Sequence, residues 1–152
     1  MIRKIFNNDS LPFITGCSLN SKEIESGDMF FPIKGMKFDG HDFIEEAVKN
    51  GASLVLNEKN IKNYSDIPII NVDNVMETIK KLAKAWRIEI DCEIIGITGS
   101  NGKTSTKELL NQIISQSKQI MSTKGNYNST LGLPMSILSI SNKDQLGILE
   151  IG

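Results

Sequence analysis

The sequence has 152 residues, 39% hydrophobic and 23% charged, with a formal net charge of −1 at pH 7. This is the composition of a globular chain that can form one domain or two small ones. A net charge so close to zero argues against general binding of nucleic acids. Without a signal-like apolar segment or a run of about 18 apolar residues, we expect a cytoplasmic protein with no membrane span. Cys17 and Cys92 form no disulfide or zinc pattern, and we expect both to be small buried residues.

The first half of the chain predicts strands and helices in alternation. Short apolar runs predict strands at residues 28–33, 53–56 and 68–72. Between the first two, residues 41–52 have helical spacing and a glycine near the end, which predicts a helix. A second helix follows the third strand, with Asp73 or Asn74 as its N-cap. Its apolar residues fall on one face, which favours packing over ligand binding for the tryptophan: Val75, Ile79, Leu82, Ala83 and Trp86.

The second half repeats this alternation. Residues 93–98 predict a strand, and a helix follows a glycine-rich loop and extends to about Ser117. The spacing places four apolar side chains on the inner face of this helix: Leu109, Leu110, Ile113 and Ile114. Further runs predict a strand at 118–123, a short helix at 134–140 with Pro134 in its first turn, and a buried strand at 146–152. Such alternation predicts a mainly parallel α/β sheet, with a domain boundary near residues 86–93.

The loop itself reads "GITGSNGKTSTKELL" from residue 96 to residue 110. The standard phosphate loop, G-x-x-x-x-G-K-[ST], requires a glycine where this chain has Ile97, so the strict pattern fails by one place. Gly99 and Gly102 nevertheless let backbone amides turn inward at the positive end of the next helix. The pattern therefore predicts a phosphate cradle, and a glycine-rich turn with a coincidental Lys-Thr pair is the alternative.

Two side chains would complete this cradle. Lys103 would reach the β- and γ-phosphates of a nucleotide as a point charge, and the Thr104 hydroxyl would bind Mg²⁺. A second metal ligand is expected at the end of a neighbouring strand, and the last apolar run offers Glu150 there. An outward-facing glutamate on an edge strand is the alternative interpretation of Glu150.

These segments resemble the Mur ligases. The loop, "STKGNYNSTLGLPMSIL" and "LEIG" look like the start of that family's ATP-binding domain, whose loop has the form T-G-x-N-G-K-T. Upstream, "SLNSKEIESGDMFFPIKGMKFDGHDFIEEAVKNGA" resembles the family's small N-terminal domain, which holds the UDP part of the substrate. The resemblance implies a small N-terminal α/β domain at 1–88 and, at 89–152, the first part of a P-loop-containing, mainly parallel α/β ATP-binding domain.

The resemblance also assigns site residues. ATP would bind at Gly99, Ser100, Asn101, Gly102, Lys103, Thr104 and Ser105, with Lys103 catalytic and with Mg²⁺ on Thr104 and Glu150. The UDP-linked substrate would contact Ser21, Lys22, Lys34, Gly35, Asp39, Gly40, His41, Asn126 and Asn128. The two distal asparagines are otherwise turn residues, and His41 is otherwise a residue at a helix N-terminus rather than an acid or base.

One motif departs from the family. Where the family has Asp-Ser-Arg, this chain has Asn20, Ser21 and Lys22. Lysine lacks the planar, bidentate grip of arginine on phosphate or carboxylate. We therefore expect a looser contact with the UDP-sugar.

The implied reaction is ATP-dependent amide-bond formation through an acyl phosphate. Among the family's types, the motifs look most like the ligases that join UDP-N-acetylmuramoyl tripeptide to D-alanyl-D-alanine in peptidoglycan synthesis. A P-loop kinase or ATPase, and a non-catalytic module that binds UDP-sugar or nucleotide, are the alternatives. Family members are much longer, so we expect a fragment or a truncated relative that is inactive alone, and a monomer at full length.

Overall fold

The structure is a computed structural model that describes residues 1–59, 67–123 and 130–152. It divides into two compact units, Met1–Leu82 and Ala83–Gly152. The boundary falls inside the helix α3, Val75–Glu89. The functional domains predicted at 1–88 and 89–152 stay a prediction. In the described part of the chain, every helix is too short or too polar to cross a membrane.

The first unit contains a parallel four-stranded sheet with the strand order β1-β2-β3-β4. Its strands are Gly16–Ser18, Asp28–Phe30, Leu54–Asn57 and Ile69–Asn71. The last three strands were predicted from apolar runs. The first was not, because its sequence, Gly-Cys-Ser, has no such run. The short helix α1, Ile2–Ile5, precedes the sheet.

A short helix packs against this sheet. α2 spans Ile44–Lys49, and the 3-10 turn η2, Gly40–Phe43, leads into it, so the predicted helix begins with a tighter turn. Ile44 and Ala47 pack with Phe30 and Val55 of the sheet. A second 3-10 turn, η1, covers Ser21–Glu23 and lies against α2.

Helix α3 begins with the side-chain cap that the sequence predicts. Asn74 Oδ1 accepts the backbone N–H of Glu77 at 2.8 Å, so Asn74 rather than Asp73 is the cap. Trp86 packs with Ile90 and Cys92, and its ring N–H donates to the Ile140 carbonyl at 2.9 Å. The expected packing role of the tryptophan is confirmed.

The second unit alternates strands and helices as predicted. Its elements are β5 (Glu93–Ile97), α4 (Lys103–Ile114), β6 (Ile120–Ser122), α5 (Gly132–Leu138) and β7 (Leu146–Glu150). The three strands are parallel, in the order β5-β7-β6. Because β7 is central, its last residue, Glu150, lies opposite Ile97 at the end of β5.

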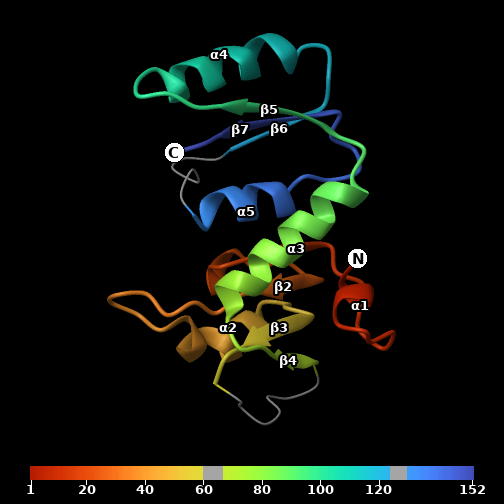
Figure 1. Cartoon of the computed structure of the whole chain (residues 1–152). Coiled ribbons are helices and arrows are strands. Elements are labelled where there is room, and N and C mark those ends of the chain that lie inside the picture. Colours follow the sequence, from red (N-terminus) through yellow and green to blue (C-terminus); the bar gives the residue numbers. More distant parts are fainter. Residues whose placement is uncertain (60–66, 124–129) are drawn as a thin grey trace. The chain divides into compact units, whose positions relative to one another are not determined.

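The two faces of this sheet are covered by different helices (Figure 1). On one face, Leu110 and Ile114 of α4 pack against a core that includes Ile97 and Ile148. α5 lies over the other face (Figure 1). The expected parallel α/β sheet of alternating strands and helices is found within this unit.

One prediction about α4 is wrong. Leu109 and Ile113 were expected on the inner face but are 58% and 59% exposed. Each residue advances a helix by about 100°, so a face centred on Leu110 and Ile114 turns the preceding residues outward. Lys107, one turn before these residues, is the residue of the helix that is buried.

Candidate functional site

The glycine loop connects the end of β5 to the start of α4. Gly99 has a φ of +147° and Gly102 a φ of +77°, a region that side-chain-bearing residues rarely adopt. A Cβ at Gly102 would meet nothing within 4 Å, so the backbone conformation, not a lack of space, requires glycine there. The predicted role of these glycines in turning the loop is consistent with this geometry.

The N-terminus of α4 is open to an anion. Gly102 is its N-cap and supplies no side-chain cap, and the first turn has no acidic residue. The first amides of a helix have no partner within the helix and carry partial positive charge. Ser100, Asn101 and Ser105 are exposed around this end. Backbone donors and the helix dipole therefore converge where a phosphate is predicted.

Lys103 is the first residue of this helix. Its Nζ donates to the Gly99 carbonyl at 2.7 Å, which holds the ammonium across the loop. A phosphate bound to the loop amides would lie next to this charge. The lysine side chain is half-buried.

Thr104 and Glu150 come together from different elements. Thr104 Oγ1 lies 3.1 Å from Glu150 Oε2 and 3.3 Å from Oε1. Glu150 is only 3% exposed and ends the central strand, so the alternative of an outward-facing glutamate on an edge strand is wrong. The structure thus pairs the two predicted metal ligands.

The oxygen atoms of this pair suit Mg²⁺, which prefers a few carboxylate and hydroxyl ligands together with phosphates and water. Within residues 1–59, 67–123 and 130–152, no three His, Cys, Asp or Glu side chains gather into a group that could hold a metal. A metal at Thr104 and Glu150 could take nucleotide oxygens and water as further ligands.

Lys107 is a further residue of this site, which the sequence pattern did not identify. Its Nζ donates to the Thr123 carbonyl at 3.0 Å and lies 3.7 Å from Glu150 Oε2. The available signal was its position: Lys107 follows Lys103 by four residues on the same helix, so both lie on one face.

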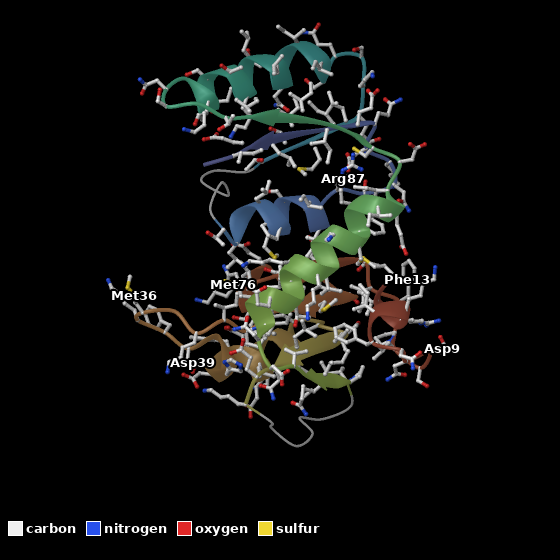
Figure 2. The ribbon with its side chains drawn as sticks, viewed as in Figure 1. Asp9, Phe13, Met36, Asp39, Met76 and Arg87 are labelled. Carbon is white, nitrogen blue, oxygen red and sulfur yellow. The ribbon has the colours of Figure 1, made fainter. Side chains whose placement is uncertain are left out.

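The first unit has a groove of about 820 Å³ that contains several predicted substrate residues. Ser21, Lys22, Gly35 and Gly40 line it. Asn20, Lys37 and several apolar side chains complete the walls, and one of the apolar residues, Met36, is fully exposed at the tip of its loop (Figure 2). A different hollow, of about 730 Å³ beside β5, contains none of the predicted residues.

Three other predicted substrate residues, Lys34, Asp39 and His41, are not among those that line this groove. Lys34 is exposed and pairs with Asp39 in an isolated antiparallel bridge of the backbone. The Asp39 carboxylate contacts Lys59 at 2.7 Å and His41 Nδ1 at 2.6 Å. The Lys59 ammonium, followed by the His41 ring, holds the pKa of Asp39 well below its usual range.

His41 is 6% exposed, and both of its ring nitrogens have partners. Nε2 accepts the backbone N–H of Glu58 at 3.4 Å, which leaves Nδ1 as the donor to Asp39. This pairing joins the loop before α2 to the end of β3. The geometry favours a positioning role and gives no sign of acid–base chemistry.

Asn20 and Lys22, which replace the family's Asp and Arg, lie at the start of the 3-10 turn η1. Asn20 Oδ1 accepts the backbone N–H of Lys22 and so caps η1, while its amide donates to Glu23 at 2.9 Å. Ser21 donates to Glu46, which holds η1 against α2. The Lys22 side chain is exposed at the rim of the groove. The predicted substrate residues Asn126 and Asn128 lie outside the described residues.

A parallel sheet, a glycine loop after its first strand and a helix with an open N-terminus define an α/β protein with an anion-binding strand–loop–helix unit. Comparison with known proteins makes this class specific. Residues 97–152 match the Mur ligase middle domain, and residues 13–87 match the domain described as Mur ligase family, catalytic domain. The chain therefore belongs to the Mur ligase family. Individual relatives support its resemblance to one type within that family, MurF, the ligases that join UDP-N-acetylmuramoyl tripeptide to D-alanyl-D-alanine.

One such relative is the UDP-N-acetylmuramoyl-tripeptide–D-alanyl-D-alanine ligase of Bacillus subtilis. It is 34% identical over 91% of this chain and 31% of its own length. The crystal structure of MurF ligase from Thermotoga maritima in complex with ADP has 38% identity and a TM-score of 0.74, over 91% of this chain and 32% of that one. A crystal structure of MurF from Acinetobacter baumannii has 33% identity and a TM-score of 0.79, over 95% and 32%. The chain thus spans about a third of the length of these relatives.

Proposed function

We propose that this chain provides the nucleotide loop and the UDP-substrate groove of an ATP-dependent ligase that adds D-alanyl-D-alanine to UDP-N-acetylmuramoyl tripeptide, a step of peptidoglycan precursor synthesis. The relatives named above support the reaction and its substrates. The geometry supports separate sites for the nucleotide and the UDP-linked substrate, since the glycine loop and the groove belong to different units.

The uncapped N-terminus of α4 is the observation that carries this proposal. Gly102 turns the chain into the helix without a side-chain cap, and the Lys103 ammonium lies against the Gly99 carbonyl of the same loop. Triphosphate oxygens would accept hydrogen bonds from these donors. Mg²⁺ would be held by Thr104 and Glu150 and would neutralise phosphate charge when bound.

In the proposed reaction, a substrate carboxylate attacks the γ-phosphorus of ATP and ADP leaves. The amine of D-alanyl-D-alanine then attacks the acyl phosphate, and inorganic phosphate leaves as the amide forms. This chemistry needs alignment and charge stabilisation more than covalent help from the protein. Fixed backbone amides and one lysine suit that requirement, because they are already oriented before the charge develops.

The groove of the first unit fits the other substrate. A UDP-sugar offers phosphates for the exposed Lys22 ammonium and a flat uracil ring for apolar walls such as Phe38 and Phe43. Ser21 already donates to Glu46 and Asn20 caps its own turn, so Lys22, Lys37 and the backbone would make the polar contacts here.

Nucleotide binding tests the first half of the proposal. Mg-ATP is titrated into the parent chain, Lys103→Ala and the control Lys118→Ala, whose side chain makes a surface ion pair with Glu93 at 3.6 Å. Loss of the loop charge should weaken binding by about 10- to 100-fold, whereas the control stays within about twofold. Equal affinities for the parent and Lys103→Ala would overturn the phosphate cradle.

A second titration tests the groove. We expect UDP-N-acetylmuramoyl compounds to shift amide resonances around Lys22 and Phe38, and Lys22→Ala to weaken their binding. Lys22→Arg should tighten it, since arginine can grip a phosphate with two donors. Resonance changes confined to the glycine loop on adding the UDP-sugar would contradict this assignment.

A further inference from the structure

Lys107 is a buried cation inside the nucleotide-binding unit. It is 6% exposed. Lysine is almost never buried unless its charge is paired. Among the described residues, its ammonium contacts the Thr123 carbonyl at 3.0 Å and Glu150 Oε2 at 3.7 Å. The functions assigned above to Lys103 and Thr104 do not use this side chain.

The position of Lys107 ties it to the metal carboxylate. Thr104 and Lys107 are three residues apart on α4, so they face the same side of the helix and both reach Glu150. Thr123 holds the carboxylate's own backbone: its hydroxyl accepts the Glu150 N–H at 3.1 Å. Lys107 thus connects the carboxylate to the chain segment that supports it.

A purely structural account of this ion pair is weak. Replacing a buried ion pair with apolar residues of similar volume is often neutral or stabilising, so the pair does little for stability that leucine or methionine could not do. The spacing suggests another use. At 3.7 Å the ammonium orients the carboxylate without a short hydrogen bond, and the Thr123 carbonyl keeps the ammonium in place when an oxygen of Glu150 binds a metal.

We propose that Lys107 is a positioning residue: it fixes the Glu150 carboxylate in the orientation that a nucleotide-bound divalent metal requires. This inference rests on the proposed function, in which Glu150 and Thr104 hold that metal. Groups behind metal ligands orient them, and their loss typically weakens metal affinity by about 10- to 100-fold. Lys107 would therefore act on the metal and not on the nucleotide itself.

The test uses the 152-residue chain, ADP and Mn²⁺ as a spectroscopic substitute for Mg²⁺. Mn²⁺ affinity of the ADP complex is measured by electron paramagnetic resonance, and ADP affinity is measured separately in EDTA. We expect Lys107→Met to weaken Mn²⁺ binding by about 10- to 100-fold and to leave ADP binding in EDTA within about twofold. The matched control, Lys118→Met, should change neither.

A double-mutant cycle separates positioning from a general effect. In the Glu150→Gln background, Lys107→Met should change Mn²⁺ affinity by less than about twofold, because the carboxylate on which Lys107 acts is gone. Parental Mn²⁺ affinity in Lys107→Met, or an equal loss in both backgrounds, would overturn the proposal.

Melting temperatures keep the proposal testable if Lys107→Met folds poorly. The substitution leaves a buried carboxylate without its cation, so it should lower the melting temperature more in the parent than in Glu150→Gln. Equal decreases in both backgrounds would overturn the coupling. A different result would overturn the proposed function. If neither Mn²⁺ nor Lys103→Ala changed the ADP affinity, both nucleotide binding at the loop and the positioning role of Lys107 would be overturned. If only the Lys107 cycle failed, the proposal of nucleotide binding would stand.

Discussion

The two units prepare their candidate sites in opposite ways. In the first unit, several side chains predicted to meet the substrate already have partners within the protein: Asp39 binds Lys59 and His41, and Ser21 binds Glu46. In the second unit, the helix after Gly102 starts without a side-chain cap, and its donors face an open loop. Internal pairing shapes one site, while unpaired backbone donors form the other.

Because of this difference, substitutions in the two units should change different properties of the protein. A residue whose partners are all within the protein contributes mainly to stability, because its loss leaves buried groups unsatisfied. A residue that orients an open loop contributes mainly to binding. Substitutions in the two units should therefore be distinguishable by whether they change stability or binding.

His41→Ala should have the largest effect on stability. It removes a buried ring, leaves the Glu58 N–H without its acceptor and takes one donor from the Asp39 carboxylate, at a cost of about 2–3 kcal/mol. Urea unfolding measures the free energy, and hydrogen exchange should locate the loss in β2 and β3. Asp42→Ala, at an exposed neighbour, is the control and should change little. A stable His41→Ala variant that no longer binds UDP-sugar would instead make the histidine a direct substrate contact.

Gly102→Ala should affect the open site. A φ of +77° costs a side-chain-bearing residue about 1–2 kcal/mol, so the loop must strain or change shape. We expect weaker Mg-ATP binding with a modest loss of stability, measured by calorimetry and urea unfolding.

Gly96→Ala is the matched control for that variant. Gly96 lies in β5 outside the left-handed region, and a Cβ there meets only the flexible end of Ile151, at 3.1 Å. Its effect on nucleotide affinity should be small. Equal loss of affinity in both variants would show that the conformation at Gly102 is not what presents the donors.

Much of this contrast could be anticipated from the sequence. Backbone-based sites leave a strong pattern, because glycine, lysine and threonine are required at fixed spacing around a strand and a helix, and this located Gly102 and Thr104 correctly in the fold. Pairing between side chains leaves no such pattern. The sequence could not show that Ser21 is bound to Glu46, or that Lys107 supports Glu150, since both contacts depend on how separate elements pack.

Asp39→Asn should reveal the ion pairs of the first unit through pH. Because the pKa of Asp39 is lowered in the folded state, its charged form stabilises the protein above the ordinary aspartate value of about 3.9. That contribution is lost as the pH falls below this value towards the folded-state pKa. The parent should exceed the variant in urea midpoint at pH 7, and the gap should close on acidification. A gap that is independent of pH would show that shape, rather than charge, holds Lys59 and His41.

The smallest effect is expected on the outer face of α4. Hydrophobic spacing alone placed Leu109 and Ile113 inside, but both are more than half exposed, so Leu109→Gln and Ile113→Gln should each change stability by less than about 0.5 kcal/mol. Leu110→Gln is the contrasting variant, since Leu110 packs against the core of the sheet and should cost well over 1 kcal/mol. Urea unfolding of the three variants under one condition measures the difference. Comparable losses at Leu109 and Leu110 would mean that the outer face is covered in solution, and the apolar spacing of the helix would then have been a correct guide to burial.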